Sequence, residues 1–207
     1  MEDVRRRIAE ACTRAGRDPG AVTLVVVTKT VPAGAIPELA ALGVKDIGEN
    51  RPIEGLERVG KLVRFRRHMI GHVQTNKLKK ALEWTDVLHS VDRPKLVEEL
   101  ARQPKRPPVY LQVNVSGEAS KGGFRPEETE AAVSRARGPL DVLGLMTMAP
   151  AGEDARPHFR RLRELAARCG LRGLSMGMTQ DFEAAVEEGS TCVRIGTAVF
   201  EGVFGYN

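Results

Sequence analysis

The sequence predicts an α/β protein: a single (β/α)8 barrel of the TIM type with an extra helix at its N-terminus. Short apolar segments recur about eight times in the 207 residues, and most are separated by segments with helical spacing. A regular alternation of strands and helices indicates a parallel sheet. Several apolar segments are continuous, as expected of strands covered on both faces. Eight units in this length are compact but sufficient for a closed barrel, and an open doubly wound sheet is the alternative.

The extra helix is predicted from the first residues, because Val4, Ile8 and Ala11 share one helical face. The first strand follows in TLVVVT, residues 23–28. The remaining strands are expected at residues 44–47, 68–71, 87–91, 109–115, 140–146, 173–176 and 192–195. No linker or low-complexity tract interrupts the pattern, so we expect one domain over residues 1–207.

Helix signals lie between the predicted strands. The segment IPELAALG reads as a helix closed by Gly43, and RPKLVEELARQ follows Asp92, a candidate N-cap. The segment TQDFEAAVEEG has Thr179 as a candidate cap and Gly189 as a stop. Two further helices are expected at residues 125–138 and 158–170.

The composition excludes several classes of protein. The net charge is +5, but acidic and basic residues are interleaved, which is not typical of an obligate nucleic-acid binder. The basic stretches at 64–68 and 77–80 indicate a solvated face, with a phosphate-bearing partner as the alternative. Cys12, Cys169 and Cys192 are odd in number and widely spaced, which indicates neither a disulfide framework nor a zinc site.

The expected location is the cytoplasm, without membrane attachment. The N-terminal segment MEDVRRRIAEA is charged and lacks the apolar region of a secretion signal. No stretch approaches the ~20 apolar residues that a membrane-spanning helix needs.

Polar residues and glycines follow most of the predicted strands. Lys29 follows the first strand, Asn50 the second and His72 the third. In a (β/α) barrel the carboxyl ends of the strands gather at one rim, where functional groups lie. We therefore expect these residues to face a common site.

Two segments at this rim are candidate anion cradles. In SMGMTQDF, backbone N–H groups near Gly177 and Thr179 would point outward, and Ser175 would add a hydroxyl. In RIGTA, Gly196 permits close backbone approach and Thr197 adds a donor. Turn chemistry alone would use the same residue types. A phosphate site between the seventh and eighth strand loops is nevertheless common in such barrels.

Lys29 gives the expected site its chemistry. Beside apolar strand residues and near Arg194, its amine would lose solvation and meet a like charge, and both effects favour the neutral form. A neutral amine can attack a carbonyl and form a Schiff base. A surface lysine at the start of a loop is the alternative. A lysine combined with a phosphate cradle fits pyridoxal 5′-phosphate (PLP), which carries an aldehyde and a phosphate.

Seven segments together resemble one family. They are VVVTKTVP, IGENRPIEGLERV, HMIGHVQTNKLKKAL, LHSVDRPKLVEEL, LQVNVSGEASKGGF, GLMTMAP and LSMGMTQDFEAAVEEGSTCVRIGTAVFEG. In this order they resemble the pyridoxal phosphate homeostasis proteins, the YggS/PROSC-like proteins, which have a barrel of the alanine-racemase N-terminal type. The resemblance covers nearly the whole chain and implies a single barrel that holds PLP.

The resemblance also implies the cofactor-binding residues, which are Lys29, Asn50, Met146, Ser175, Met176, Arg194, Gly196 and Thr197. Lys29 matches the lysine of the Schiff base, Ser175 the phosphate-binding serine, and Gly196 with Thr197 the loop that closes on the phosphate. Arg194 matches the arginine at the pyridine nitrogen. Asn50 lines the pocket, and the two methionines are its apolar walls or, equally, ordinary barrel core. His72 lies at a position that varies in the family.

The resemblance implies a carrier rather than an enzyme. An arginine at the pyridine nitrogen cannot accept its proton, so the ring would stabilise a carbanion poorly. Alanine racemases add a second domain and a tyrosine base, whereas we expect no second domain here and find only Tyr110 and Tyr206. We therefore expect a monomeric protein that stores, protects and delivers PLP, with PLP-dependent apo-enzymes as candidate recipients. The alternatives are a small PLP-dependent amino-acid racemase and a nucleic-acid partner that uses residues 64–80.

Overall fold

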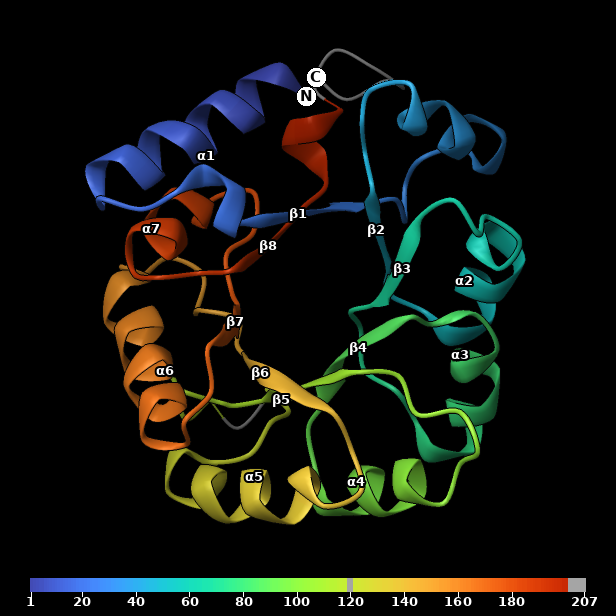
Figure 1. Cartoon of the computed structure of the whole chain (residues 1–207), viewed down its shortest axis with the longest axis vertical. Helices are drawn as coiled ribbons and strands as arrows, with labels where there is room; N and C mark the ends of the chain where they lie inside the picture. The colour runs from blue at the N-terminus through green and yellow to red at the C-terminus, as the bar shows by residue number, and fades with distance from the viewer. Residues whose placement is uncertain (119–120, 201–207) are drawn as a thin grey trace.

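The computed structural model describes residues 1–118 and 121–200. Eight parallel strands form a closed barrel in sequence order, with helices packed around it (Figure 1). The strands are β1 (Thr23–Val27), β2 (Asp46–Glu49), β3 (Arg66–Met69), β4 (Val87–Val91), β5 (Val109–Gln112), β6 (Val142–Met146), β7 (Gly173–Ser175) and β8 (Cys192–Ile195). The pairing of β1 with β8, for example Val25 with Arg194, closes the sheet and excludes the open alternative.

The helices cover the outside of the barrel. The α-helices are α1 (Glu2–Arg14), α2 (Pro52–Val59), α3 (Leu78–Trp84), α4 (Pro94–Ala101), α5 (Thr129–Arg137), α6 (Arg156–Arg168) and α7 (Phe182–Glu187). The 3-10 segments are η1 (Pro19–Ala21), η2 (Ala33–Ala40), η3 (Thr75–Lys77), η4 (Pro126–Glu128) and η5 (Thr197–Val199). Within the described ranges, none of these helices is long and apolar enough to span a membrane.

The extra N-terminal helix is confirmed. Helix α1 buries Val4, Ile8 and Ala11 as the spacing predicts, and it packs beside α7 (Figure 1). All eight predicted strands are present, and the bounds of β4 and β8 coincide with those predicted. That one domain extends over residues 1–207 stays a prediction, because residues 119–120 and 201–207 lie outside the described ranges.

Three local predictions differ from the structure. The segment closed by Gly43 is the 3-10 helix η2 rather than an α-helix, because Pro37 lies inside it and cannot donate a backbone hydrogen bond. Asp92 does not cap α4, which begins after Arg93, and its carboxylate instead contacts His72 and Arg93. Thr179 does not cap α7 either, because that helix begins after Asp181.

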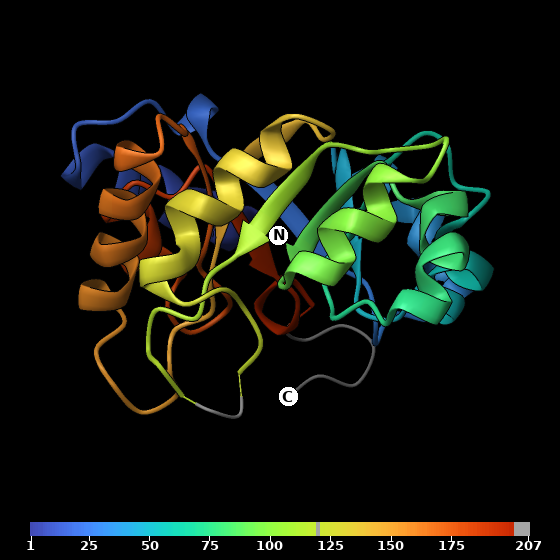
Figure 2. The same cartoon turned by 90° about the horizontal axis from the view of Figure 1, so that it is seen from below.

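The apolar core is divided in two by the barrel wall. The larger cluster gathers buried side chains from strands and surrounding helices, including Trp84 and Phe159. A smaller cluster of Val87, Tyr110 and Met146 is separate from it. The buried polar residues include His68, His89, Ser175 and Arg194, which lie on β3, β4, β7 and β8. In the side view the loop after β6 projects from one edge of the barrel (Figure 2).

Candidate functional site

A cavity of about 180 Å³ opens at the carboxyl ends of the strands. Its polar lining comes from Lys29, Thr30, Asn50, Thr179, Arg194 and Thr197. Its remaining lining comes from Val27, Ile70, Met148, Met178 and Gly196. The structure therefore brings together five of the eight predicted residues: Lys29, Asn50, Arg194, Gly196 and Thr197.

A buried polar cluster fixes the loop that carries Lys29. The hydroxyl of Thr28 donates to Glu49 Oε1 at 2.7 Å, and Arg58 Nε donates to the same oxygen at 3.1 Å. Arg58 Nη2 also donates to the carbonyl oxygens of Thr28, at 2.7 Å, and Val31, at 2.5 Å. Because these contacts lie on both sides of Lys29, they set where its side chain leaves the backbone.

The surroundings of Lys29 differ from the expectation in one respect. The residue is exposed rather than enclosed by apolar strand residues, so the expected loss of solvation is not found. Its proximity to Arg194 is found, since both residues line the cavity. The geometry leaves the amine accessible to a ligand that enters from solvent.

Arg194 forms the buried polar floor of the cavity. Only 4% of the residue is exposed, and burial lowers the pKa of its guanidinium. Nη1 donates to Ser175 Oγ at 2.6 Å and Nη2 donates to the carbonyl of Thr147 at 3.1 Å. These bonds use two of the five N–H donors of an arginine, so the others can serve a ligand.

Three predicted residues do not line this cavity. Ser175, Met146 and Met176 are fully buried at the ends of β7 and β6. The hydroxyl of Ser175 is hydrogen-bonded to Arg194 and to His89. The geometry therefore gives no support to its predicted contact with phosphate. The methionines are barrel core, which was the alternative interpretation.

The cavity wall is instead formed two residues further along each segment. Met148 and Met178 line it in place of Met146 and Met176. Alternate residues of a strand point to the same side, so Met148 lies one layer nearer the rim than Met146. Met178 follows the turn at Gly177, which has φ +97°. The motifs GLMTM and LSMGM each carry a methionine at both positions, which is why the sequence alone did not separate them.

The turn after β7 places Thr179 beside Thr197 at the cavity. Gly177 adopts φ +97°, and a Cβ there would lie 2.6 Å from Ala185 Cβ, so glycine is required. Asp181 then holds the turn, because its Oδ1 accepts from the backbone N–H of Met178 at 2.6 Å. Burial raises the pKa of the Asp181 carboxyl.

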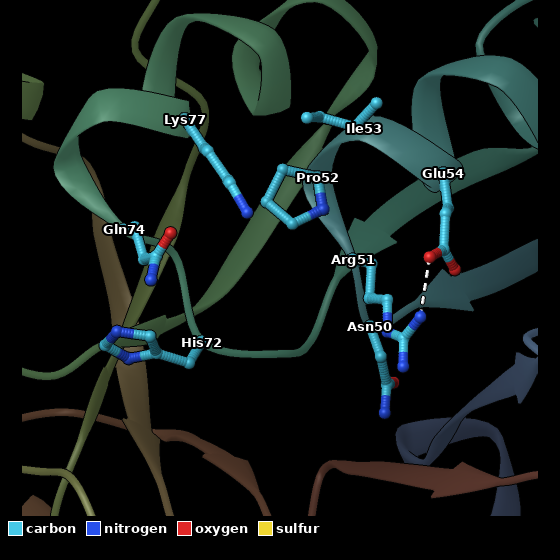
Figure 3. A pocket seen from close by; sticks show the side chains of 8 residues that line it. All are labelled: Asn50, Arg51, Pro52, Ile53, Glu54, His72, Gln74 and Lys77. Atoms are coloured by element: carbon cyan, nitrogen blue, oxygen red, sulfur yellow. Dashed lines mark hydrogen bonds and ion pairs between the residues drawn. The ribbon is translucent and has the colours of Figure 1, made fainter.

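Asn50 lies between this cavity and a second one. Its Oδ1 is buried and has no hydrogen-bond partner among the described residues. The second cavity, of about 420 Å³, is shown in Figure 3 and is lined by Asn50, Arg51, Pro52, Ile53, Glu54, His72, Gln74 and Lys77. His72 therefore lies away from Lys29, and its Nδ1 is 2.7 Å from Asp92 Oδ2.

The basic residues between 64 and 80 do not form one face. Arg66 and Arg67 lie at the amino end of β3, whereas Lys77 follows its carboxyl end. The Arg67 guanidinium pairs with Asp86 at 2.8 Å. The stretch is therefore divided between opposite ends of the barrel.

Comparison with known proteins identifies the family. Residues 1–202 match the family model of the alanine racemase N-terminal domain. A pyridoxal phosphate homeostasis protein of Pseudomonas aeruginosa is 46% identical over 210 residues, which are 95% of this chain and 91% of that protein. The chain belongs to the pyridoxal phosphate homeostasis protein family.

Other family members and one more distant barrel are also similar to this chain. The family member of Escherichia coli K12 is 39% identical, over 97% of this chain and 94% of its own. PipY of Synechococcus elongatus PCC7942, solved with PLP bound, is 34% identical with a TM-score of 0.80, over 93% of this chain and 99% of PipY. Alanine racemase of Corynebacterium glutamicum is 18% identical with a TM-score of 0.71, over 100% of this chain and 62% of its own, which shows the shared fold.

The cavity residues suit a flat, anionic aldehyde of the PLP type. Lys29 offers an amine, while Arg194, Thr179 and Thr197 offer hydrogen-bond donors for oxygen or ring nitrogen. The buried Asn50 Oδ1 is an acceptor that a donor group of a ligand would satisfy. Apolar walls from Met148, Met178, Val27 and Ile70 leave space for a ring.

Proposed function

We propose that this chain binds PLP at the cavity around Lys29 and serves its homeostasis as a carrier. The observation that carries the proposal is the convergence of Lys29 with Arg194, Asn50 and the two threonines on one cavity. The PLP-bound structure of PipY, at 34% identity, and the name that the curated relatives share support it.

Each residue has a distinct part in holding the cofactor. PLP supplies an aldehyde, which condenses with an amine to a Schiff base and releases one water. We assign the amine to Lys29 and the phosphate contacts to Thr179, Thr197 and Gly196. Thr179 replaces Ser175 in this assignment, because Ser175 is buried against Arg194. Arg194, at the floor of the cavity, would offer a hydrogen-bond donor to the ring nitrogen.

The same geometry favours carriage over catalysis. A guanidinium donates protons in hydrogen bonds but does not accept one, so it keeps a facing ring nitrogen unprotonated. An unprotonated ring withdraws electrons weakly. Tyr110 is not placed to act as a base, because it lies on β5 below the cavity, where burial raises the pKa of its hydroxyl. Tyr206 lies outside the described residues.

Borohydride reduction followed by peptide mapping tests this function. The purified protein mixed with PLP is expected to absorb in the visible range, and reduction is expected to fix the cofactor on the peptide that contains Lys29. Lys29→Ala should lose both signals. Lys77→Ala, at the neighbouring cavity of Figure 3, is the matched control and should retain them. An adduct on any other lysine would overturn the assignment.

Two further assays separate carriage from catalysis. Solvent deuterium exchange at the α-carbon of alanine or serine, far above the rate with free PLP, would show the racemase alternative. Delivery is tested by mixing the loaded protein with a PLP-dependent apo-enzyme in the presence of a scavenger of free PLP. Reactivation despite the scavenger is expected of direct transfer, and complete suppression would contradict it.

A further inference from the structure

A continuous run of hydrogen-bonded side chains crosses the interior of the barrel. Asp46 Oδ1 is 2.9 Å from His68 Nε2, and His68 Nδ1 is 2.8 Å from His89 Nε2. His89 Nδ1 is in turn 2.8 Å from Ser175 Oγ, which accepts from Arg194 Nη1 at 2.6 Å. We call these five residues the interior chain.

The interior chain connects the two ends of the barrel. Asp46 is the first residue of β2, at the amino ends of the strands, and its side chain is 17% exposed. His68, His89 and Ser175 are at most 3% exposed, and Arg194 forms the floor of the Lys29 cavity. A partly solvated carboxylate is thus linked to the cofactor site through buried groups alone.

When both imidazoles are neutral, the chemistry of the two ends fixes every proton between them. An arginine can only donate and a carboxylate can only accept, whereas a neutral imidazole has one donor and one acceptor. Four bonds are then satisfied by four protons, on Arg194 Nη1, Ser175 Oγ, His89 Nε2 and His68 Nε2. All donors point from Arg194 toward Asp46. A second proton on either histidine would instead put a proton on His89 Nδ1, with Ser175 Oγ accepting from it.

The surroundings of His89 favour this neutral arrangement. Burial, and then the positive charges of neighbouring groups, lowers the pKa of His89 well below its ordinary value. The charged and titratable groups that face it are His68, Arg194, Arg66 and Tyr110, whose ring centroid is 4.7 Å from that of His89. Cys192 and Asp46 lie nearby, and burial raises the pKa of the Cys192 thiol to about 11.

We propose that Asp46, His68, His89 and Ser175 are positioning residues that hold the Arg194 guanidinium in one orientation beneath the cofactor. Burying this many polar groups is costly unless each is paired, and apolar side chains of similar size would fill a barrel without that requirement. The interior chain gives Arg194 one side-chain acceptor, Ser175 Oγ, in a fixed place, beside the backbone carbonyl of Thr147. The inference rests on the proposed function only in that PLP is the ligand that Arg194 faces.

Nitrogen NMR of the histidines tests the chain without PLP and without any variant. In ¹⁵N-labelled protein at neutral pH, the geometry of the interior chain predicts that His68 and His89 each carry their proton on Nε2 and none on Nδ1. The other two of the four histidines, His72 and His158, do not belong to the interior chain and account for the remaining signals. A charged imidazole, or a proton on Nδ1 of either buried histidine, would overturn the proposal.

Ser175→Ala and His89→Leu test the effect on Arg194 in the PLP-loaded protein. Each is expected to weaken PLP binding about tenfold, as for loss of a hydrogen bond to a charged group, and to shift its absorption maximum. Asp46→Asn keeps an acceptor for His68 and should bind PLP like the wild type, whereas Asp46→Leu should not. His158→Gln, on α6, is the control.

The outcomes distinguish this inference from the proposed function. If the wild type binds no PLP, the proposed function fails. The tautomers of His68 and His89 still show whether the hydrogen bonds of the interior chain are formed. If the wild type binds PLP and the affinity and absorption of Ser175→Ala are unchanged, the interior chain does not position Arg194. Misfolding of the variants, monitored by circular dichroism, leaves the NMR measurement of the wild type as the deciding test.

Discussion

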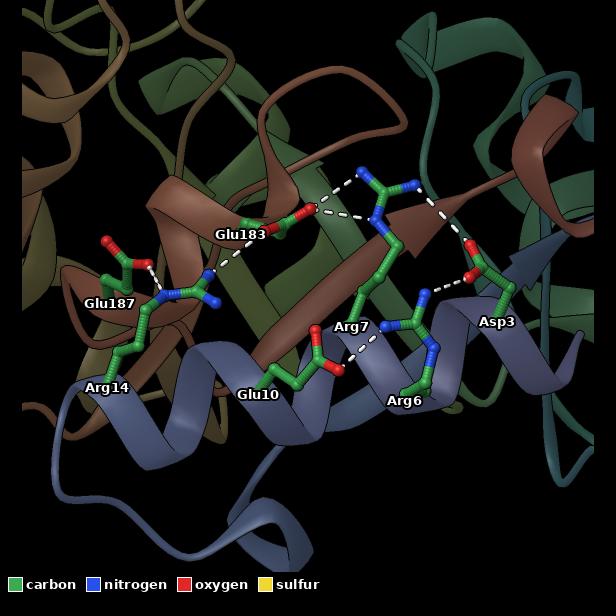
Figure 4. Close-up of polar contacts among 7 residues, drawn as sticks. All are labelled: Asp3, Arg6, Arg7, Glu10, Arg14, Glu183 and Glu187. Atoms are coloured by element: carbon green, nitrogen blue, oxygen red, sulfur yellow. Dashed lines mark hydrogen bonds and ion pairs between the residues drawn. The ribbon is translucent and has the colours of Figure 1, made fainter.

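Two groups of arginine–carboxylate pairs have similar distances but opposite surroundings. On the surface between α1 and α7, Arg14 Nε is 2.6 Å from Glu187 Oε1, and Arg7 Nη2 is 2.7 Å from Glu183 Oε1 (Figure 4). Below the Lys29 loop, Arg58 Nε is 3.1 Å from Glu49 Oε1. The Glu49 side chain is 3% exposed, whereas that of Arg14 is 48% exposed.

The comparison shows that distance alone does not set the value of a charge pair. Exposed pairs contribute about 0–1 kcal/mol, because water screens the charges and two long side chains lose freedom. Removing one partner of a buried pair costs far more, because the other charge stays buried without compensation. The short contacts between α1 and α7 should therefore matter less than the longer one below Lys29.

The largest effect is expected for Arg58→Met. This change leaves the buried Glu49 carboxylate with Thr28 as its remaining partner, and it removes the donors to the Thr28 and Val31 carbonyls. A decrease of about 3 kcal/mol in the free energy of unfolding is expected, measured by urea denaturation.

The matched control for Arg58→Met lies at the start of the same helix. Arg51 precedes α2 and pairs with Glu54 at 2.6 Å, but its side chain is 74% exposed. Arg51→Met should leave the urea midpoint unchanged. Equal destabilisation by the two variants would show that burial does not separate the two classes of pair.

The second largest effect is expected from mild acid, through His89. Its pKa is lowered by burial in the folded state, whereas in the unfolded chain it is about 6.5. Below pH 6.5 the unfolded state therefore binds more protons, and stability falls as pH decreases. Between pH 6.5 and pH 5.5 we expect a loss of about 1 kcal/mol from this group.

Urea denaturation across this pH range measures the slope. His89→Leu removes the titrating group, so its stability should depend less on pH between 6.5 and 5.5. Arg51→Met, at an exposed position that leaves all four histidines in place, should retain the wild-type slope. A wild-type stability that is flat over this interval would contradict a neutral, buried His89.

An intermediate effect is expected for Arg7→Ala. Its guanidinium lies 4.7 Å from the ring centroid of Phe182 as well as pairing with Glu183, and its side chain is 35% exposed. A decrease of about 1 kcal/mol is expected from loss of the cation–π contact and of the packing of the stem. Arg7→Lys keeps the charge and should recover part of this loss. Full recovery by Arg7→Leu would assign the effect to packing alone.

The fold could be predicted from local patterns of apolar and turn residues in the sequence. Most strands contain a local apolar run bounded by glycine, proline or polar residues, so their positions could be predicted without knowing their neighbours. The exceptions are β2 (DIGE) and β3 (RRHM), whose predicted bounds are each shifted by two residues. The closure of the sheet follows from the repeated strand–helix unit. That Lys29, Asn50, Arg194, Gly196 and Thr197 line one cavity agrees with the family resemblance and with their places in or just after the predicted strands.

The remaining details depend on contacts between distant segments. Whether Ser175 or Thr179 reaches the cavity depends on where β7 ends relative to its neighbours, and pleating reverses the side at each residue. The Glu49–Arg58 pair and the interior chain join residues from different strands and helices. A single sequence contains no signal that pairs His68 with His89 across 21 positions.

The smallest effect is expected for Arg6→Ala, although its contacts are among the shortest. Arg6 donates to Asp3 Oδ1 at 2.5 Å and to Glu10 Oε1 at 2.7 Å (Figure 4). Its side chain is 59% exposed, and those of both acids are about half-exposed or more. No measurable change in the urea midpoint is expected, in low salt or in 1 M salt, because water already screens these charges. A loss as large as that of Arg58→Met would mean that proximity, not burial, governs the charge pairs of this barrel.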